Sequence, residues 1–232
     1  MKKLFAFLFL ALTVSLLYAG AIQEDNKRAE EQSKMSYAFG MAIGSNLLST
    51  DLEFDYDAFA QGMKAMMEGE DMWFTEMEAL EIVETALQEA ADKKAEQNRI
   101  EEEFFLSVNQ GRAEVHVTPS GLQYEILTDA EGEKPGPDSA VRVQYEGYFK
   151  DGTLFDSSYD EPDGVIIPLA RVIPGWTEGL LLMSPGSKYK LYIPSSLAYG
   201  KDGLYQMIPP YSTLIFVVEL LEIVDIDFGN YY

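Results

Sequence analysis

The chain of 232 residues contains no cysteine and only one histidine. Without cysteine, neither a disulfide framework nor a lipid-modified cysteine can form, so the fold must be stabilised by its core alone. The single histidine, His116, leaves almost no material for a Ser-His-Asp triad or a multi-histidine zinc site. Catalysis by a nucleophile or a metal is therefore not expected, and neither is a cofactor.

Basic residues are also scarce. The chain has 17 lysine and arginine residues against 39 aspartate and glutamate residues, which gives a formal net charge of -22. Such a charge repels phosphate backbones and anionic lipid headgroups. Nucleic acid is therefore excluded as an expected partner, whereas the 47% hydrophobic content is ample for a globular core.

A hydrophobic run lies at the N-terminus but is short. Two lysines precede the uncharged segment Leu4 to Leu17, and Ala19 and Ala21 then offer cleavage positions. A membrane-spanning helix needs about 20 apolar residues, so a membrane anchor is the weaker interpretation. We predict that residues 1–21 are a signal peptide that is removed on export. Export without cysteine favours the periplasm or outer cell envelope of a bacterium.

Helical patterns fill the first half of the remaining chain. Residues 22–34 are polar and are predicted to form a solvated leader, and residues 35–75 have apolar positions at helical spacing. Residues 76–110 contain neither glycine nor proline and predict one connecting helix of roughly 50 Å.

Polar residues mark the predicted helix ends. Ser36 is suited to cap the first helix, and either Asp55 or Asp57 the second. Thr75 and Glu78 have the spacing of a capping box at the start of the third helix.

The period changes from helix to strand after residue 111. Leu122, Tyr124 and Ile126 alternate with polar residues, as a half-buried strand requires. Only the segment from Pro174 to Met183 has a helical pattern here. We predict a strongly bent antiparallel sheet packed on one short helix over residues 111–228, and an α+β class for the whole chain.

Methionine is concentrated in the short helical half, which holds seven of the ten. This side chain is flexible and suits adaptable apolar contacts. A loosely specified core, a dimer interface and a surface for unfolded clients are all compatible with it. Three short helices have difficulty forming a core alone, which favours a dimer. The residues are Met35, Met41, Met63, Met66, Met67, Met72 and Met77.

A constellation of aromatic, aliphatic and polar residues lies between residues 141 and 216. It offers apolar walls, one acid and one phenol, but no nucleophile. Taken alone, aromatic side chains on a bent sheet are more often core residues than site residues. The members, in chain order, are Tyr145, Phe155, Asp156, Val172, Ile173, Trp176, Tyr199, Ile208 and Phe216.

The order and spacing of these residues resemble the FKBP-type peptidyl-prolyl cis-trans isomerases. The segments 36–40 and 43–47 resemble the companion domain of the macrophage infectivity potentiator (Mip) group. Together the two resemblances cover nearly all of the chain after the signal peptide. They imply an FKBP-like sheet wrapped on a short helix, a homodimer formed through the helices of residues 35–75, and a possible macrolide ligand.

The resemblance also implies roles for individual residues. The catalytic residues would be Trp176, as an aromatic floor, Tyr199, which would hydrogen-bond a substrate carbonyl, and Asp156, which would orient the substrate. Substrate-binding roles would belong to Tyr145, Phe155, Val172, Ile173, Ile208 and Phe216, with Val165 and Met207 at positions that vary within the family.

The sequence does not decide which side chain holds the Asp156 carboxylate in place. Some relatives pair this aspartate with an arginine that follows the Phe-Asp-Ser-Ser segment, and this chain has none there. Either Tyr145 or Tyr199 is expected to hold the carboxylate instead.

The expected function is a peptidyl-prolyl isomerase that assists the folding of exported, proline-containing proteins. Rotation about an X-Pro bond crosses a barrier of about 18 to 20 kcal/mol, which an apolar pocket can lower by favouring the twisted amide. The alternative is a periplasmic holdase chaperone or surface interaction protein whose FKBP-like module has little or no activity.

Overall fold

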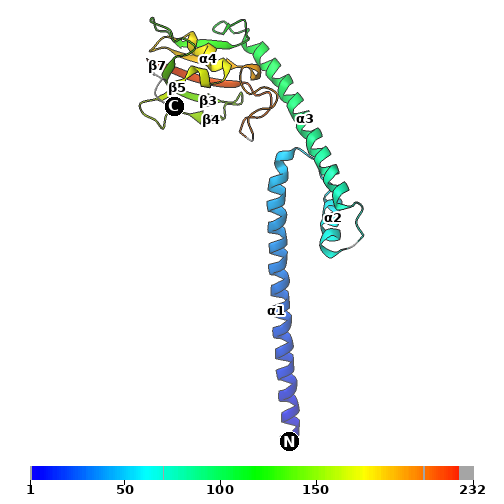
Figure 1. Cartoon of the computed structure of the whole chain (residues 1–232). Coiled ribbons are helices and arrows are strands. Elements are labelled where there is room, and N and C mark those ends of the chain that lie inside the picture. Colours follow the sequence, from blue (N-terminus) through cyan, green and yellow to red (C-terminus); the bar gives the residue numbers. More distant parts are fainter. Residues whose placement is uncertain (1, 70, 206, 225–232) are drawn as a thin grey trace, which may run out of the picture. The chain divides into compact units, whose positions relative to one another are not determined.

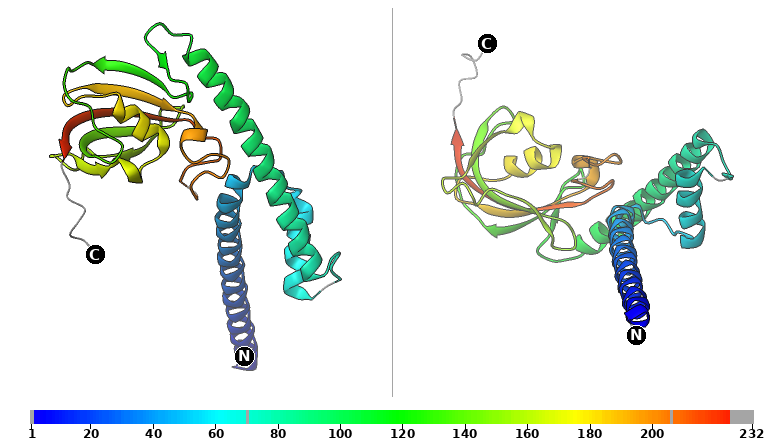
Figure 2. Two further views of the ribbon diagram at one scale, coloured as in Figure 1. Left: turned by 45° about the horizontal axis from the view of Figure 1, so that its top comes forward. Right: turned by 90° about the horizontal axis from the view of Figure 1, so that it is seen from below.

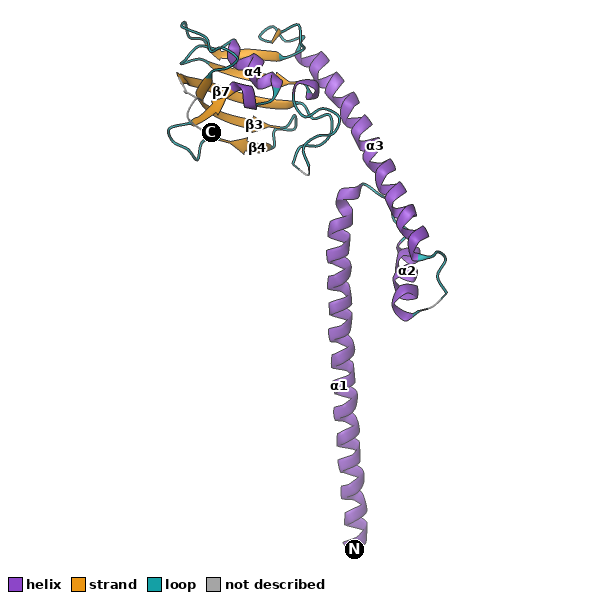
Figure 3. Ribbon diagram, in the orientation of Figure 1, coloured by secondary structure: helices purple, strands orange, loops and turns teal. Residues whose placement is uncertain are grey.

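A computed structural model describes residues 2–69, 71–205 and 207–224, with side chains from residue 24 onward. The chain divides into two compact units, Met1–Ala91 and Asp92–Tyr232. The regular elements described in the first unit are all helices, whereas the second contains a sheet (Figure 3). The predicted α+β class, with a helical region before an antiparallel sheet, is confirmed.

The long helix α3 belongs to both units, because the boundary between them falls inside it. The predicted long connecting helix is therefore confirmed as an element of the fold. The helical elements, labelled in part in Figure 1, are α1 (Lys2–Leu47), η1 (Leu48–Thr50), α2 (Tyr56–Glu68) and α3 (Glu76–Asn109).

The prediction that the first helix begins at Ser36 is wrong, because α1 runs without a break from Lys2 to Leu47. The residues 24–34 are mostly good helix formers, and Glu30 and Lys34 form an ion pair of 2.6 Å at i,i+4 spacing. The polar segment of residues 24–34 is therefore helical, and its side chains are exposed, whereas its role as a leader stays a prediction.

The predicted signal peptide stays a prediction. Met1 lies outside the described residues, and the side chains of residues 2–23 are not described. Across the described part of the chain, no helix is both long enough and apolar enough to cross a membrane.

The caps of the next two helices are confirmed. The Oδ1 atom of Asp55 accepts hydrogen bonds from the backbone N–H groups of Asp57 and Ala58, at 3.0 and 3.1 Å. The backbone N–H of Thr75 donates to Glu78 at 2.8 Å, and the Glu78 N–H donates to the Thr75 hydroxyl at 3.3 Å. Asp55, not Asp57, caps α2, because its extended backbone aims the carboxylate at the N–H groups of the first turn.

The second unit is an antiparallel sheet that curves around the short helix α4 (Figure 2). The strand order is β1-β2-β6-β7-β3-β4, and β5 also pairs with β3. The elements are β1 (His116–Val117), β2 (Gln123–Thr128), β3 (Ala140–Tyr148), β4 (Leu154–Ser157), β5 (Val165–Pro168), η2 (Leu169–Arg171), α4 (Pro174–Leu181), β6 (Lys188–Ile193), η3 (Ser195–Leu197) and β7 (Leu214–Val224).

The core of this unit lies between α4 and the sheet. Leu180 on α4 is completely buried, as are Leu191 on β6 and Val218 on β7. Gly175 allows a very close approach, since a Cβ atom at that position would lie 2.3 Å from Cγ2 of Ile193. The absence of a side chain at residue 175 therefore lets α4 lie directly on β6, which places Trp176 beneath the sheet.

Candidate functional site

An open pocket of about 410 Å³ lies at one side of the second unit. Strands β3, β4, β5 and β7, helices η2 and α4, and the segment after η3 all contribute side chains to it. Residues that are far apart in sequence therefore meet at one place. The lining residues are Tyr145, Asp156, Ile167, Arg171, Val172, Ile173, Trp176, Tyr199 and Phe216.

Three aromatic rings form the deepest part of the pocket. Trp176 on α4 and Phe216 on β7 are buried, and Tyr145 on β3 is half-buried. The Trp176 ring lies 4.9 Å from the Tyr145 ring and 5.1 Å from the Phe216 ring, at interplanar angles of 87° and 88°. Such edge-to-face contacts are the geometry that aromatic quadrupoles favour. The pocket therefore has a stiff aromatic floor.

Phe155 supports this floor from behind instead of lining the pocket. Its ring meets the Phe216 ring edge-to-face at 5.5 Å. Gly147 on the neighbouring strand makes room for both rings, because a Cβ atom there would lie 2.8 Å from Phe216 and 2.9 Å from Phe155. A side chain at residue 147 would push the aromatic floor out of place.

The carboxylate of Asp156 is held by Tyr145, which answers the question that the sequence left open. The Tyr145 hydroxyl donates to Oδ2 of Asp156 at 2.8 Å, and the backbone N–H of Ser157 donates to Oδ1 at 2.9 Å. Ser158 fixes the backbone of Tyr145 in turn, since its hydroxyl accepts from the Tyr145 N–H at 2.8 Å. Asp156 is exposed on β4 and lines the pocket.

Burial, followed by the hydrogen bond to Asp156 and the charge of that carboxylate, raises the pKa of Tyr145 above its ordinary value of 10.0. The phenol therefore stays protonated at neutral pH and remains a hydrogen-bond donor to the carboxylate.

Tyr199 and the residues before α4 complete the rim. Within the described part of the chain, no residue hydrogen-bonds the exposed hydroxyl of Tyr199, so it is available to a ligand. Val172 and Ile173 are half-buried. The carbonyl of Ile173 accepts the backbone N–H groups of Trp176 and Thr177 at 3.0 and 3.2 Å, which fixes this short segment to the start of α4.

Four predicted site residues do not line the pocket. Besides Phe155, these are Ile208, which is buried in the core, Val165, which pairs with Val143, and Met207, which is 66% exposed. Their contacts with substrate stay predictions.

Two lining residues, Ile167 and Arg171, were missed. Ile167 lies two positions after Val165 on β5, and side chains two positions apart on a strand point to the same face, so the position of Val165 together with strand alternation could have indicated Ile167. Arg171 directly precedes Val172 and is exposed at the rim in η2. Among the described residues, no group of histidine, aspartate or glutamate side chains is arranged to hold a metal ion.

Comparison with known proteins identifies the family. Residues 131–221 match the family described as FKBP-type peptidyl-prolyl cis-trans isomerase, and residues 32–126 match the domain amino terminal to that isomerase. The chain is also 40% identical over 198 residues to a probable FKBP-type isomerase, FkpA, of Neisseria meningitidis serogroup B, which covers 81% of this chain and 73% of that one. The chain belongs to the FKBP-type peptidyl-prolyl cis-trans isomerases.

Other relatives of this isomerase are also bacterial. Outer membrane protein MIP of Legionella longbeachae is 34% identical over 200 residues, which is 83% of this chain and 86% of that protein. The crystal structure of FkpA from Escherichia coli has a TM-score of 0.69 and 32% identity, and the match covers 82% of this chain and 95% of that one. The predicted isomerase activity, on peptide bonds that precede proline, is confirmed at the level of the family.

The raised pKa of Tyr145 predicts a pH dependence of stability. The folded state holds this proton more tightly than the unfolded chain, so the contribution is complete below pH 10.0 and is lost as the pH rises through the folded-state pKa. In Asp156→Asn the loss is expected to begin at a lower pH, because the negative charge no longer opposes ionisation of the phenol.

The measurement is NMR titration of the tyrosine Cζ carbons, with Tyr145→Phe to assign the signal. Tyr145→Phe should also lose this part of the pH dependence of unfolding. An identical Tyr145 titration in wild type and Asp156→Asn would contradict the coupling.

Proposed function

We propose that this isomerase twists X-Pro bonds against the aromatic floor formed by Tyr145, Trp176 and Phe216. The observation that carries the proposal is the convergence of these rings beside the Asp156 carboxylate and the exposed Tyr199 hydroxyl. An apolar floor with few, fixed polar groups is the usual composition of a small-ligand site.

The apolar floor acts on the electronic structure of the amide. A planar amide separates charge between its oxygen and nitrogen, and the barrier of about 18 to 20 kcal/mol reflects this resonance. The twisted amide has lost most of that charge separation. Because a water-poor pocket stabilises a polar group less than bulk water does, it destabilises the planar amide more than the twisted one.

The two polar groups orient the substrate. Tyr199 donates a hydrogen bond to a substrate carbonyl at the rim, and Asp156, held in place by Tyr145, fixes the direction of approach. Val172 and Ile173 grip the proline ring beside Trp176. Orientation of this kind lowers the barrier because the entropy of positioning is lost on binding and not in the reaction step.

Removal of the Tyr199 hydroxyl is expected to lower kcat/KM by about tenfold, which corresponds to one hydrogen bond of about 1.4 kcal/mol made in the transition state. The substitution is Tyr199→Phe, and the measurement is NMR exchange of an X-Pro tetrapeptide. Tyr205→Phe is the matched control, because this phenol belongs to the same segment but is 94% exposed and does not line the pocket. Equal rates for both variants and wild type would rule out this role of Tyr199.

We further propose that the isomerase is exported to the bacterial cell envelope, where its substrates are proline-containing exported proteins that are still folding. Support comes from the predicted signal peptide and from the bacterial relatives, one of which is named an outer membrane protein. Intact-mass measurement of the protein made in a bacterial host should show that it begins at residue 20 or 22. A mass that includes the first 19 residues would contradict this.

The helical unit supports the proposal of a homodimer. Ala65 is the only buried hydrophobic residue described between residues 24 and 91. An apolar groove of about 770 Å³ runs between α1 and α2, and Phe39, Met63 and Met67 on its walls are 65%, 42% and 86% exposed. Apolar surface of this extent costs free energy in water, and a second copy of the same helices would cover it.

Phe39→Glu is expected to convert a dimer to a monomer, because a carboxylate would be placed in the apolar groove. Analytical ultracentrifugation gives the mass, and tetrapeptide isomerisation should stay at the wild-type rate because the pocket lies in the other unit. Gln61→Glu is the matched control, since it adds the same charge to an exposed position of α2 that does not line the groove. A wild-type chain that is monomeric at micromolar concentration would contradict the proposed homodimer.

A holdase chaperone is the second candidate function, and the exposed methionines of the helical unit favour it. Phe39→Glu and its control Gln61→Glu also test whether the groove has a chaperone role. If the groove binds unfolded clients, Phe39→Glu should lose protection of a proline-free client against aggregation. If wild type gives no protection, the chaperone role is absent.

A further inference from the structure

The helix α3 carries a buried carboxylate that the proposed mechanism does not use. Glu102 is only 8% exposed, whereas its neighbour Glu101 is half-buried and Glu103 is exposed. Burial of a charged group costs free energy unless hydrogen bonds replace the lost water. The partners of Glu102 therefore indicate what the residue does.

All three donors to Glu102 come from the segment that carries part of the pocket rim. Oε1 accepts from the Ser195 backbone N–H at 2.5 Å, and Oε2 accepts from the Ser195 hydroxyl at 2.7 Å. Oε1 also accepts from the Thr213 hydroxyl at 3.3 Å. Ser195 begins η3 and Thr213 directly precedes β7, so one carboxylate binds both ends of residues 195–213.

This segment needs such support because it has little regular structure of its own. After η3, its described residues form only an isolated bridge between Leu204 and Ile208. Tyr205 and Tyr211 have positive φ angles of 47° and 54°, which are unfavourable for residues other than glycine. A segment of this kind is held in place by contacts with neighbouring elements.

A chain of hydrogen bonds leads from Glu102 to the neighbour of Tyr199. The Ser195 N–H binds Glu102, and the Ser195 carbonyl accepts from the Gly200 N–H at 2.9 Å. The Gly200 carbonyl then accepts from the Tyr211 N–H at 2.9 Å. The backbone on the C-terminal side of Tyr199 is therefore fixed through Ser195 to the carboxylate on α3.

The adjacent part of α3 is itself attached to the second unit. Asn98, one turn before Glu102, donates to the carbonyl of Pro210 at 2.9 Å, and Gln123 on β2 donates to the carbonyl of Leu106 at 2.9 Å. Helix α3 is therefore bound to the second unit both before and after Glu102 in the chain, which fixes the position of this residue.

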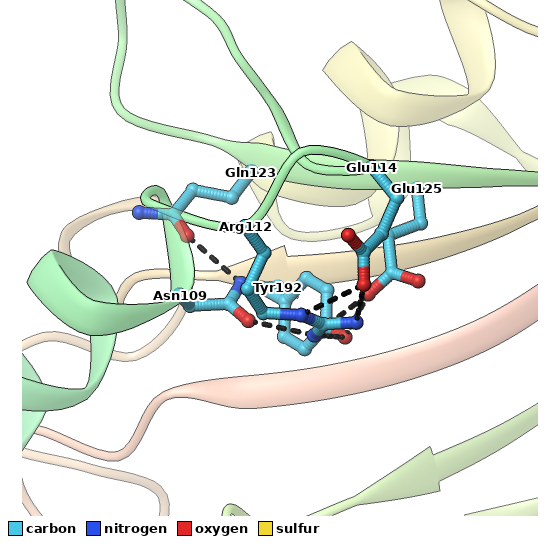
Figure 4. Close-up of polar contacts among 6 residues, drawn as sticks. All are labelled: Asn109, Arg112, Glu114, Gln123, Glu125 and Tyr192. Atoms are coloured by element: carbon cyan, nitrogen blue, oxygen red, sulfur yellow. Dashed lines mark hydrogen bonds and ion pairs between the residues drawn. The ribbon is translucent and has the colours of Figure 1, made fainter.

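A polar network fixes the end of α3 (Figure 4). Asn109 donates to Gln123 at 2.9 Å, and Arg112 donates to Asn109 and to the Tyr192 hydroxyl, each at 3.0 Å. Arg112 also forms an ion pair of 2.9 Å with Glu125, which accepts a hydrogen bond from the Tyr192 hydroxyl. Strands β2 and β6 therefore anchor α3 close to Glu102.

We propose that Glu102 is a positioning residue of the isomerase site, which holds residues 195–213 so that Tyr199 stays at the pocket rim. The end of α3 is then part of the catalytic unit and not only a connector. The inference rests on the proposed role of Tyr199.

Glu102→Ala is expected to lower kcat/KM by about tenfold, the same loss as Tyr199→Phe, because it acts through that residue. The kcat/KM of the double variant Glu102→Ala/Tyr199→Phe should be no lower than that of either single variant. If Glu102 acts only through the Tyr199 hydroxyl, its removal has no further effect once that hydroxyl is absent. Glu102→Gln keeps an acceptor for the Ser195 N–H and should lie within about threefold of wild type. Amide exchange of residues 195–213 should become faster in Glu102→Ala.

Glu103→Ala is the matched control, because it removes the adjacent carboxylate, whose partner is Arg99 on the same helix. It should leave both kcat/KM and amide exchange unchanged. If Glu102→Ala does not fold, Ser195→Ala replaces it, since it removes one donor to the same carboxylate and should give a smaller loss in the same direction.

Additive losses in the double variant would overturn the inference, because Glu102 would then act independently of Tyr199. If Tyr199→Phe is fully active, the proposed role of Tyr199 fails separately. The amide exchange and kcat/KM of Glu102→Ala then test the inference by themselves. A lower kcat/KM with faster exchange supports a positioning role of Glu102 for residues 195–213 as a whole. Wild-type values of both overturn the positioning role.

Discussion

The contact of helix α4 with strand β6 is the constraint on which the site depends. At Gly175 the helix lies so close to Ile193 that no side chain can fit between them. This approach places the Trp176 ring against Tyr145 and Phe216, which come from two other strands of the curved sheet. The stability of the core and the shape of the pocket therefore arise from the same packing, and the aromatic rings belong to both.

The polar groups of the unit are placed by a different kind of interaction. Buried or half-buried hydroxyl and carboxylate groups must find partners, and each partner fixes an element that hydrophobic packing leaves loose. Tyr145 thus determines the direction of Asp156 at the pocket, and Glu102 binds both ends of the segment that carries Tyr199. An irregular loop acquires a defined position because a buried charge cannot be left without hydrogen bonds.

The two units differ in how much apolar surface they bury. The FKBP-like unit buries a contiguous set of large apolar residues, whereas the helical unit leaves methionine and aromatic side chains exposed along its groove. A surface of this composition is suited to contact with another protein chain, and in the proposed homodimer a second copy of the same helices covers it. Association in that dimer supplies the burial that the helices of one chain do not provide.

The sequence by itself determined the α+β class, the family, the long helix α3 and the capping box at Thr75, because helix periodicity, capping and strand alternation depend on residues close in the chain. It left the cap of α2 open between Asp55 and Asp57, and the structure shows that Asp55 makes it. Local reasoning failed at Ser36, where a possible cap lies inside a continuous helix. Only the tertiary structure decided which tyrosine holds Asp156 and that Glu102 binds Ser195, 93 residues away. Such contacts depend on how elements pack, and packing is a property of the folded chain as a whole that no short segment specifies.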